Sequence, residues 1–386
     1  MKNFFSSGII KFFHLCINLI LIKLIVYKYS FHDENYIITG ISLIPLYALI
    51  INLGQINYIV NNVNFDIEGE VIVDYTKLNQ FLASVVFNFL ILSTIIFAFF
   101  PHKFDISILF SSLLALFIFL NFEYEILKGN PLNAYIQQIL PPVFLLIFFY
   151  FNFTNNLKIN FILAYSLSTI IIFYNKKNDF KLKLLSISNL FVHYVNSVKV
   201  GSVFIINTLI FLVPIILVNY YYEINNFYLA ILILYKIFST FENTSHIFSN
   251  IYNSKYFNLD KKTKDRKKYF NKLFLLNFLI TIITLIFVIK FQDFIVKFFE
   301  INESISGYEF ILILLTYFFS TLFGSFLKNN IKIYGINLIL IIQFIFFFIF
   351  FILFFLEFNL IISYFISYFL YKFLNFFIFY LYISRH

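Results

Sequence analysis

The chain has 386 residues, of which 61% are hydrophobic and only 12% are charged, and its mean hydropathy is +0.88. Soluble domains carry about 25% charged residues and have no way to bury so much apolar surface, so the composition excludes soluble, secreted and disordered classes. The single cysteine, Cys16, excludes an internal disulfide and a thiolate metal cluster. The net charge of +9 is compatible with nucleic-acid binding only if the basic residues gather on a binding surface.

The chain contains apolar stretches of about 20 residues, the helical length that crosses a ~30 Å hydrocarbon core. The predicted spans are Phe4–Tyr27, Tyr36–Val60, Lys77–Phe100, Asp105–Leu127, Pro131–Phe151, Ile159–Tyr174, Gly201–Tyr220, Phe227–Asn250, Phe270–Phe294, Tyr308–Leu327, Tyr334–Leu356 and Leu360–Leu381. The sequence therefore predicts an all-α polytopic membrane protein of about twelve transmembrane helices, in two six-helix lobes around a central cavity. We expect the lobes at 1–174 and 200–386, joined by a basic cytoplasmic linker at 175–199.

Most of the 28 Lys and Arg residues fall on one side of these spans if the N-terminus is cytoplasmic. Inside loops of polytopic proteins carry an excess of Lys and Arg, so this asymmetry predicts that both termini are cytoplasmic. The same rule accounts for the basic run Lys261–Lys268, and we therefore do not expect nucleic acid as a partner. The predicted location is the bacterial inner membrane, with multiple passes.

Polar residues at helical spacing within the spans mark candidate site residues. In lipid an ionised group costs about 2.5–3.5 kcal/mol on insertion scales, so such residues usually face a bundle interior or a water-filled cavity. The expected cavity-facing residues are Lys11, His14 and Asn18 in the first span, Asn52 and Gln55 in the second, Lys199 at the end of the linker, and Lys236, Glu242, Asn243 and His246 in the eighth. Asn121, Glu123, Glu125, Asn133 and Gln137 are further polar residues in the fourth and fifth spans.

Enzymatic classes lack the residues that they require. Every predicted outside loop is short, and no metalloprotease, serine-hydrolase or nucleotide-binding motif occurs in the sequence. Asp33 and Glu34 lie in the first outside loop, where lipid-linked glycosyltransferases carry an acidic residue, but no large external domain accompanies them. We therefore interpret this pair as part of a solvated loop, and we expect a transporter or flippase rather than an enzyme, with no metal site.

The arrangement of these segments resembles the polysaccharide flippases of the MATE-like (MOP) transporter superfamily. The segment Tyr47–Gln55 is similar to the family's stretch that ends in Asp-Leu-Gly, with Asn52 in place of the acidic residue. The stretch Glu123–Phe151 is similar to the fourth and fifth spans, where a short basic, glycine-bearing turn precedes a helix that starts Tyr-x-x-x-Gln. Gly201–Tyr220, which contains Pro214, resembles the seventh span.

The resemblance implies that the chain flips undecaprenyl-pyrophosphate-linked oligosaccharide by alternating access, for surface polysaccharide such as O-antigen. Lys11, His14, Lys199 and Lys236 would meet the pyrophosphate, and the Asn and Gln side chains would bind sugar hydroxyls. No cofactor is expected beyond H⁺ or Na⁺ as a coupling ion, with Glu242 as the coupling group. The expected partners are the lipid-linked cargo, membrane lipid and polysaccharide assembly proteins. Two alternatives stay open: a MATE-like small-molecule exporter, and a polytopic polymerase or glycosyltransferase.

Overall fold

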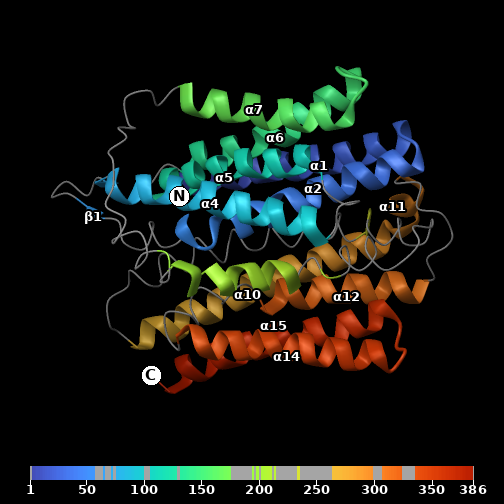
Figure 1. Ribbon diagram of the computed structural model, residues 1–386. Coiled ribbons are helices and arrows are strands. Elements are labelled where there is room, and N and C mark those ends of the chain that lie inside the picture. Colours follow the sequence, from blue (N-terminus) through green and yellow to red (C-terminus); the bar gives the residue numbers. More distant parts are fainter. Residues whose placement is uncertain are drawn as a thin grey trace. The chain divides into compact units, whose positions relative to one another are not determined.

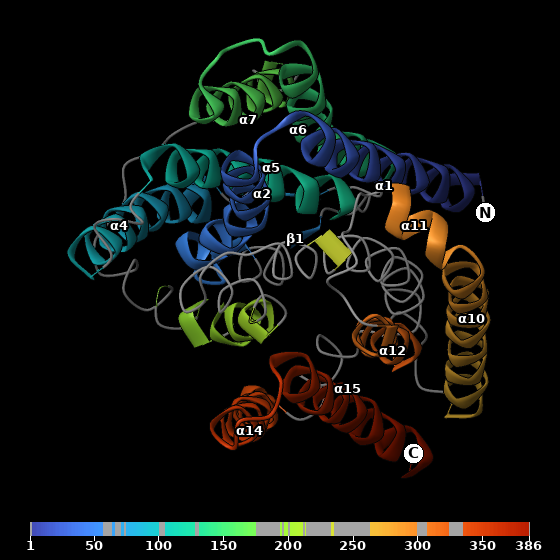
Figure 2. The same ribbon diagram turned by 90° about the vertical axis from the view of Figure 1, so that its right-hand side faces the viewer.

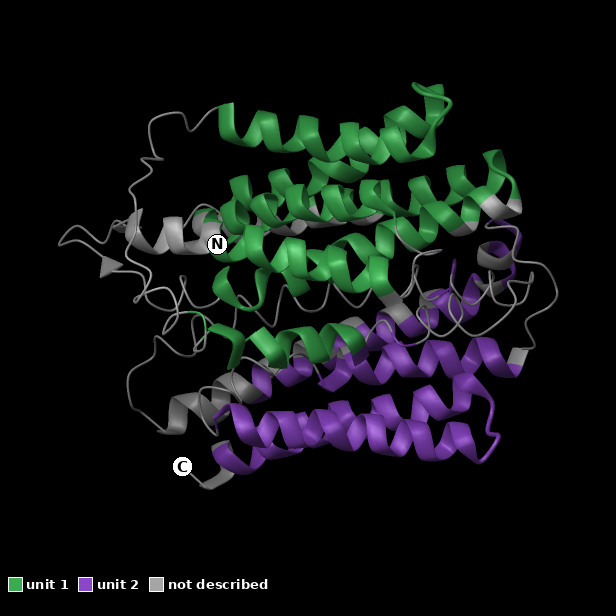
Figure 3. Cartoon of the chain, in the orientation of Figure 1, with its two compact units in different colours: residues 1–209 green, residues 210–386 purple. Residues whose placement is uncertain are grey.

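The computed structural model describes residues 2–56, 64–65, 71–72, 75–99, 105–127, 131–174, 194, 197–199, 201–210, 213, 233–234, 263–298, 307–323 and 335–385. Within these residues the chain forms two compact units, Met1–Leu209 and Ile210–His386 (Figure 3). The first unit therefore includes the beginning of the span that the sequence predicts from Gly201 to Tyr220. The eighth predicted span lies almost wholly outside the described residues, and with it Lys236, Glu242, Asn243 and His246.

Among the described residues of the first unit there are six long helices (Figure 1). They are α1 (Lys2–Lys28), α2 (Phe31–Asn52), α4 (Tyr75–Phe99), α5 (Ile106–Leu127), α6 (Pro131–Phe151) and α7 (Leu157–Tyr174). Helix α5 packs against α2, α6 and α7, and α1 packs against α6. Ser111, Ser112 and Ala115 of α5 are almost completely buried, because small side chains let neighbouring helices approach closely within a membrane.

Between α2 and α4 lies a short antiparallel pair, β1 (Asn64–Phe65) and β2 (Val71–Ile72), in which Asn64 pairs with Ile72. Helix α6 contains two consecutive prolines, Pro141 and Pro142, and α2 contains Pro45.

The second unit contains α10 (Thr263–Lys290), α11 (Gln292–Phe298), α12 (Gly307–Phe323), α14 (Ile336–Phe355) and α15 (Leu360–Arg385). Helix α15 packs against α14 and α12, as Figure 2 shows, and more narrowly against α10. A row of hydroxyl and amide side chains on α15 is buried in this unit: Ser363, Ser367 and Asn375, together with Tyr368 and Tyr371.

Five helices in the described residues are long and apolar enough to cross a membrane: Ile106–Glu123, Leu132–Phe151, Leu157–Tyr174, Ile336–Phe355 and Leu360–Tyr382. Helix α14 illustrates how such a span divides between protein and lipid. Phe346 and Phe350 are buried on its packed face, whereas Phe348 and Phe355 remain 68% and 78% exposed. Exposed aromatic side chains of this size on an apolar helix face lipid rather than water.

The ends of two predicted spans differ from the structure. Helix α2 begins at Phe31, five residues before the predicted Tyr36, so the interpretation of Asp33 and Glu34 as a solvated loop was wrong. Ser30 caps the helix by accepting a hydrogen bond from the Asp33 backbone N–H, and acidic residues are favoured in a first turn. Glu34 is only 7% exposed. Helix α10 begins at Thr263 instead of Phe270, because the basic run ahead of the apolar stretch continues the helix.

Candidate functional site

Helix α2 stops in the middle of its predicted span, and the polar residues at this break form the candidate site. The helix ends at Asn52 rather than at Val60, since Leu53 and Gly54 adopt left-handed backbone conformations with φ of 42° and 76°. The Asn52 Oδ1 atom then accepts a hydrogen bond of 2.8 Å from the Ile56 backbone N–H. Asn52 and Gln55 thus flank the two-residue turn of Leu53 and Gly54, and each is 3% exposed.

Hydrogen bonds join this break to α4 and to the residues around 197. Gln55 Nε2 donates to the hydroxyl of Ser197, which in turn donates to the Tyr194 carbonyl over 2.8 Å. Asn88 of α4 donates from Nδ2 to the Ile51 carbonyl at 2.8 Å and accepts from the Tyr194 hydroxyl at 2.8 Å. Three segments that are far apart in sequence therefore share one buried polar network.

A close backbone contact lies inside the same network. A Cβ atom added to Gly201 would come within 3.0 Å of backbone atoms of Leu53 and Gly54, nearer than real Cβ atoms come to other atoms. A Cβ on Gly54 would likewise overlap backbone atoms of Gly201 and Ser197. Only glycine allows the two segments to meet in this way.

The polar atoms at the break of α2 that have no hydrogen-bond partner among the described residues indicate which ligands it could bind. Among the described residues, Asn52 Nδ2 and Gln55 Oε1 make no further hydrogen bond. Lys199 follows Ser197 by two residues, and its side chain is exposed. The amide N–H and the amide oxygen can exchange hydrogen bonds with hydroxyl groups. The ammonium group can pair with an anion.

Of the predicted site residues, Asn52 and Gln55 lie at the break of α2, and Lys199 lies two residues after Ser197, the hydrogen-bond partner of Gln55. In α1, Asn18 Nδ2 donates to the His14 carbonyl at 2.8 Å, so this amide is used within its own helix, and His14 is half-buried. Lys11 lies in α1, but its side chain is outside the described set.

Sequence reasoning missed Asn88, Tyr194, Ser197 and the two glycines. A single Asn in the apolar run of α4 was a usable signal, because an amide inside a span needs a polar partner. The partner itself, more than 100 residues away, gave no local signal.

Helices α5 and α6 carry a second polar cluster, which includes the further residues that the sequence picked out. Asn121 Nδ2 donates to Gln137 Oε1, and Asn133 Nδ2 lies 3.5 Å from Glu125 Oε2. Asn121 and Glu125 are 2% and 3% exposed. These contacts hold the two helices together.

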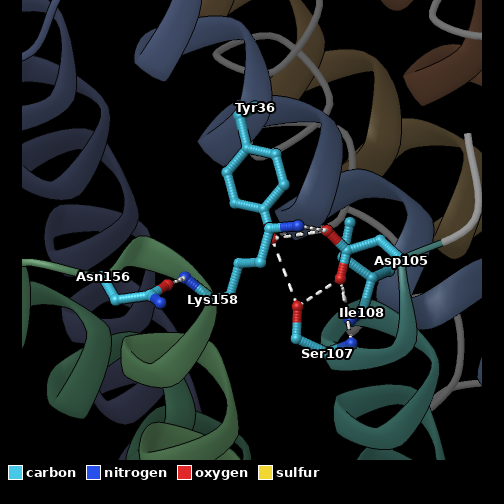
Figure 4. A network of polar contacts seen from close by, with 6 residues as sticks. All are labelled: Tyr36, Asp105, Ser107, Ile108, Asn156 and Lys158. Carbon is cyan, nitrogen blue, oxygen red and sulfur yellow. Dashed lines mark hydrogen bonds and ion pairs between the residues drawn. The ribbon is translucent and has the colours of Figure 1, made fainter. Parts of the chain in front are cut away.

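The other end of α2 carries a charged network, shown in Figure 4. The Tyr36 hydroxyl donates to Asp105 Oδ2 over 3.1 Å, and Lys158 Nζ lies 3.2 Å from the same oxygen. The Ser107 backbone N–H and hydroxyl donate to Asp105 Oδ1. Burial works to raise the pKa of the Asp105 carboxyl, but the hydrogen bonds from Ser107 and the nearby Lys158 ammonium outweigh it, so the pKa is lowered.

No protein-family model matches this sequence, and no curated protein matches it. Solved structures do match. The inward-facing conformation of a multidrug resistance MATE family transporter of the MOP superfamily has a TM-score of 0.59 and 12% sequence identity, and the match covers 98% of this chain and 98% of that one. MATE in complex with MaD3S has a TM-score of 0.58 and 11% identity, with coverages of 100% and 96%.

A third match is a MOP superfamily transporter from Pyrococcus furiosus Vc1, whose binding pocket is described as having a reverse polarity that suggests a different function. Its TM-score is 0.57 at 12% identity, and the match covers 99% of this chain and 96% of that one. Identities in this range establish the fold alone. The chain is an all-α, multi-pass membrane protein with the fold of the MATE transporters, which confirms the predicted class of about 12 helices.

Proposed function

We propose that this chain is a transporter of the MOP superfamily that flips a lipid-linked oligosaccharide across the bacterial inner membrane, with both termini cytoplasmic. The end-to-end match to transporter structures, at 98% of each chain, is the observation that carries the transporter role. A shared fold does not fix the cargo, so the cargo has to be argued from the residues of the site.

The chemistry at the break of α2 supports an anionic, hydroxyl-rich cargo. Lys199 carries an exposed ammonium group two residues after Ser197, whose hydroxyl accepts a hydrogen bond from the Gln55 amide. A pyrophosphate would pair with the ammonium, while amides exchange hydrogen bonds with sugar hydroxyls in either direction. Lys11, His14 and Asn18 of α1, and Lys236, Asn243 and His246 of the eighth span, stay part of the proposed binding surface.

The carboxylates that the structure describes lie near helix ends, whereas Glu242 of the eighth predicted span lies outside the described residues. These described acidic residues are Asp33, Glu34, Asp105, Glu123, Glu125, Asp265, Asp293, Glu309 and Glu357. An exporter of cationic small molecules would gain from a carboxylate inside the membrane, since an opposite charge offsets the loss of hydration. The transporter from Pyrococcus furiosus supports the view that pocket polarity varies on this fold.

Coupling to H⁺ or Na⁺ through Glu242 remains part of the proposal. A Glu242→Gln substitution should abolish the response of transport to an imposed ion gradient, while uncoupled exchange of cargo persists. Loss of both activities, or of neither, would remove Glu242 from the coupling role.

The cargo is tested with purified protein in proteoliposomes that contain a fluorescent undecaprenyl-pyrophosphate oligosaccharide, whose movement between leaflets is followed with a membrane-impermeant quencher. Wild-type protein should move this lipid, and Lys199→Gln should slow it, whereas Lys199→Arg should keep most of the rate. Lys297→Gln, which removes another exposed lysine, is the matched control and should have no effect.

The MATE-like exporter is the second candidate, because two of the matched structures are multidrug resistance MATE family transporters. Uptake of a cationic dye by the same proteoliposomes, without movement of the oligosaccharide lipid, would favour that alternative and contradict our proposal.

A further inference from the structure

Helix α15 carries a lysine near the middle of its membrane span. The apolar stretch Leu360–Tyr382 has 23 residues, and Lys372 is its only charged side chain. The Lys372 Nζ atom lies 5.2 Å from the centroid of the Tyr368 ring. Because Tyr368 comes eight residues after Leu360, the ammonium group lies about 12 Å from that end of the stretch. It lies farther still from the other end, so it reaches neither membrane surface.

A similar pair at the end of α1 shows a lysine that does reach the end of its helix. Lys23 Nζ lies 5.9 Å from the centroid of the Tyr27 ring, and α1 ends at the next residue, Lys28. Tyr27 is 76% exposed, as expected of an aromatic side chain at a membrane–water interface. Tyr368, by contrast, is only 2% exposed. The Lys23 ammonium group thus lies at a helix end, whereas the Lys372 ammonium group lies over a ring that is buried in the second unit.

The neighbours of Lys372 along the helix place it on the packed side of α15. The Tyr368 hydroxyl, one turn before it, shares a hydrogen bond of 3.2 Å with the hydroxyl of Ser320 in α12. Phe376 lies one turn after it, and its ring centroid is 5.3 Å from that of Phe323 in the same helix. Residues four positions apart lie on one face of a helix, so the Lys372 side chain leaves α15 toward α12.

The lipid-facing stripe of α15 lies on a different side of the helix. Phe373, Phe377 and Tyr380 are 38%, 42% and 44% exposed. They lie about 100° around the helix from Lys372, since successive residues are about 100° apart. Lys372 is nevertheless only half-buried. Because hydrocarbon does not solvate an ammonium group, the accessible part of this side chain requires polar surroundings at the depth of the membrane core.

An ammonium group in this position suits an anion. It carries three N–H donors, and a contact with a ring face leaves donors that point away from the ring. Phosphate oxygens accept such donors in strong, charge-assisted hydrogen bonds. Ionisable residues inside a membrane span commonly mark the path of a substrate or an ion, because their burial is otherwise a cost without a return.

We propose that Lys372 borders a water-filled cavity at the depth of the membrane core and there binds the pyrophosphate of the cargo. It adds a cation from the second unit to the cargo site. The inference rests on the proposed function, because it names a residue that meets the anionic part of the proposed cargo.

Binding of farnesyl pyrophosphate, which carries the same anionic group on a shorter isoprenoid, tests the proposal. Purified protein in lipid nanodiscs should bind the radiolabelled compound, and inorganic pyrophosphate should displace it, whereas farnesol should not. Lys372→Gln should weaken binding about 10- to 100-fold, because one charge-assisted bond is lost. Lys372→Arg should keep most of the affinity, since a guanidinium group also pairs with phosphate.

Lys23→Gln is the matched control, because it removes the other lysine that lies over a tyrosine ring. It should bind farnesyl pyrophosphate as tightly as the wild type. If Lys372→Gln also bound it as tightly, the role of Lys372 would be refuted and the proposed cargo would stand. If the wild type bound no farnesyl pyrophosphate, or if farnesol displaced the label as well as inorganic pyrophosphate does, the proposed cargo and this inference would both fail.

Chemical restoration of the charge separates binding from folding. In a Cys16→Ser background, Lys372→Cys is treated with 2-aminoethyl methanethiosulfonate, whose reaction with the thiol forms a disulfide that carries an ammonium group and releases methanesulfinate. Binding of farnesyl pyrophosphate should be weak before this treatment and should recover after it. Methyl methanethiosulfonate adds no charge and should not restore binding. Recovery with both reagents, or with neither, would overturn the proposal.

The rate of the same reaction tests the cavity. Phe373→Cys in the Cys16→Ser background places a thiol on the lipid-facing stripe and should react with 2-aminoethyl methanethiosulfonate more slowly than Lys372→Cys. A thiol at 372 that reacts no faster than the thiol at 373 would contradict the water-filled cavity.

Discussion

Helix α2 is held at its two ends by different kinds of chemistry. At the Tyr36 end an ionised carboxylate, Asp105, gathers hydrogen bonds and an ammonium group, and Lys158 remains 58% exposed. At the Gly54 end the Gln55 amide and the Ser197 hydroxyl are neutral and buried, and the backbones of Gly54 and Gly201 lie in close contact. Charges are used where water can still solvate them, and amides and close packing are used where it cannot.

This difference predicts that the neutral end contributes more stability than the charged end. Four experiments measure it, from the largest expected effect to the smallest. Each compares purified variants in the same detergent, by the temperature at which half of the protein loses its helical signal or its monodisperse elution.

Gly201→Ala should have the largest effect. The new methyl group would overlap backbone atoms of Leu53 and Gly54, so the two segments must move apart, and overpacking of this kind costs about 3 kcal/mol. Gly40→Ala is the control, because its methyl group would meet the ring tip of Phe161, which is a side chain. Equal losses for the two variants would mean that the backbone contact has no special role.

Asn88→Ala should cost about 1–2 kcal/mol, since it leaves the Ile51 carbonyl and the Tyr194 hydroxyl without their partner. Tyr194→Phe removes only one of these bonds and should cost about half as much. If the variant with both Asn88→Ala and Tyr194→Phe lost as much stability as the sum of the two single losses, the two residues would not belong to one network.

Acid should weaken the Tyr36 end in particular. Because the pKa of Asp105 is lowered in the folded protein, its contribution is complete above the ordinary carboxyl pKa of about 3.9 and is lost as the pH falls through the lower, folded value. Asp105→Asn keeps a helix-capping oxygen but no charge, and its stability should therefore fall less steeply in this acid range. Identical acid profiles for Asp105→Asn and the wild type would refute the assignment.

Lys158→Gln should have the smallest effect, about 0.2–1 kcal/mol, because an exposed lysine gains little from an ion pair. The effect should shrink further in high salt, which screens exposed charges. A loss of stability as large as that of Gly201→Ala would contradict the prediction that the Gly54 end of α2 contributes more stability than the Tyr36 end.

The sequence predicted the helices far better than it predicted how they meet. A span such as Pro131–Phe151 was found with its final bounds, because apolar length is a local property. The early end of α2 was missed, although Gly54 was visible, because the left-handed turn there is stabilised by contact with Gly201. The bond between Asn88 and Tyr194 joins residues 106 positions apart, and one sequence carries no pattern that links them.

The candidate site shows the same division. Asn52 and Gln55 were chosen because amides are out of place in an apolar span, and that reasoning needs no partner. Ser197 was not chosen, because a serine in a polar linker is unremarkable in composition. Its importance comes only from the tertiary contact with Gln55.

The proline pair in α6 divides that helix mechanically. Pro141 and Pro142 have no N–H, so the carbonyls of Gln137 and Gln138 lose the donors that an α-helix normally supplies. On one side of this point Gln137 is bound to Asn121 of α5, and on the other Lys28 and Tyr29 bind the Phe149 carbonyl. Two missing bonds in succession make the middle of α6 its most compliant point, so its halves can tilt independently while each end keeps its neighbour.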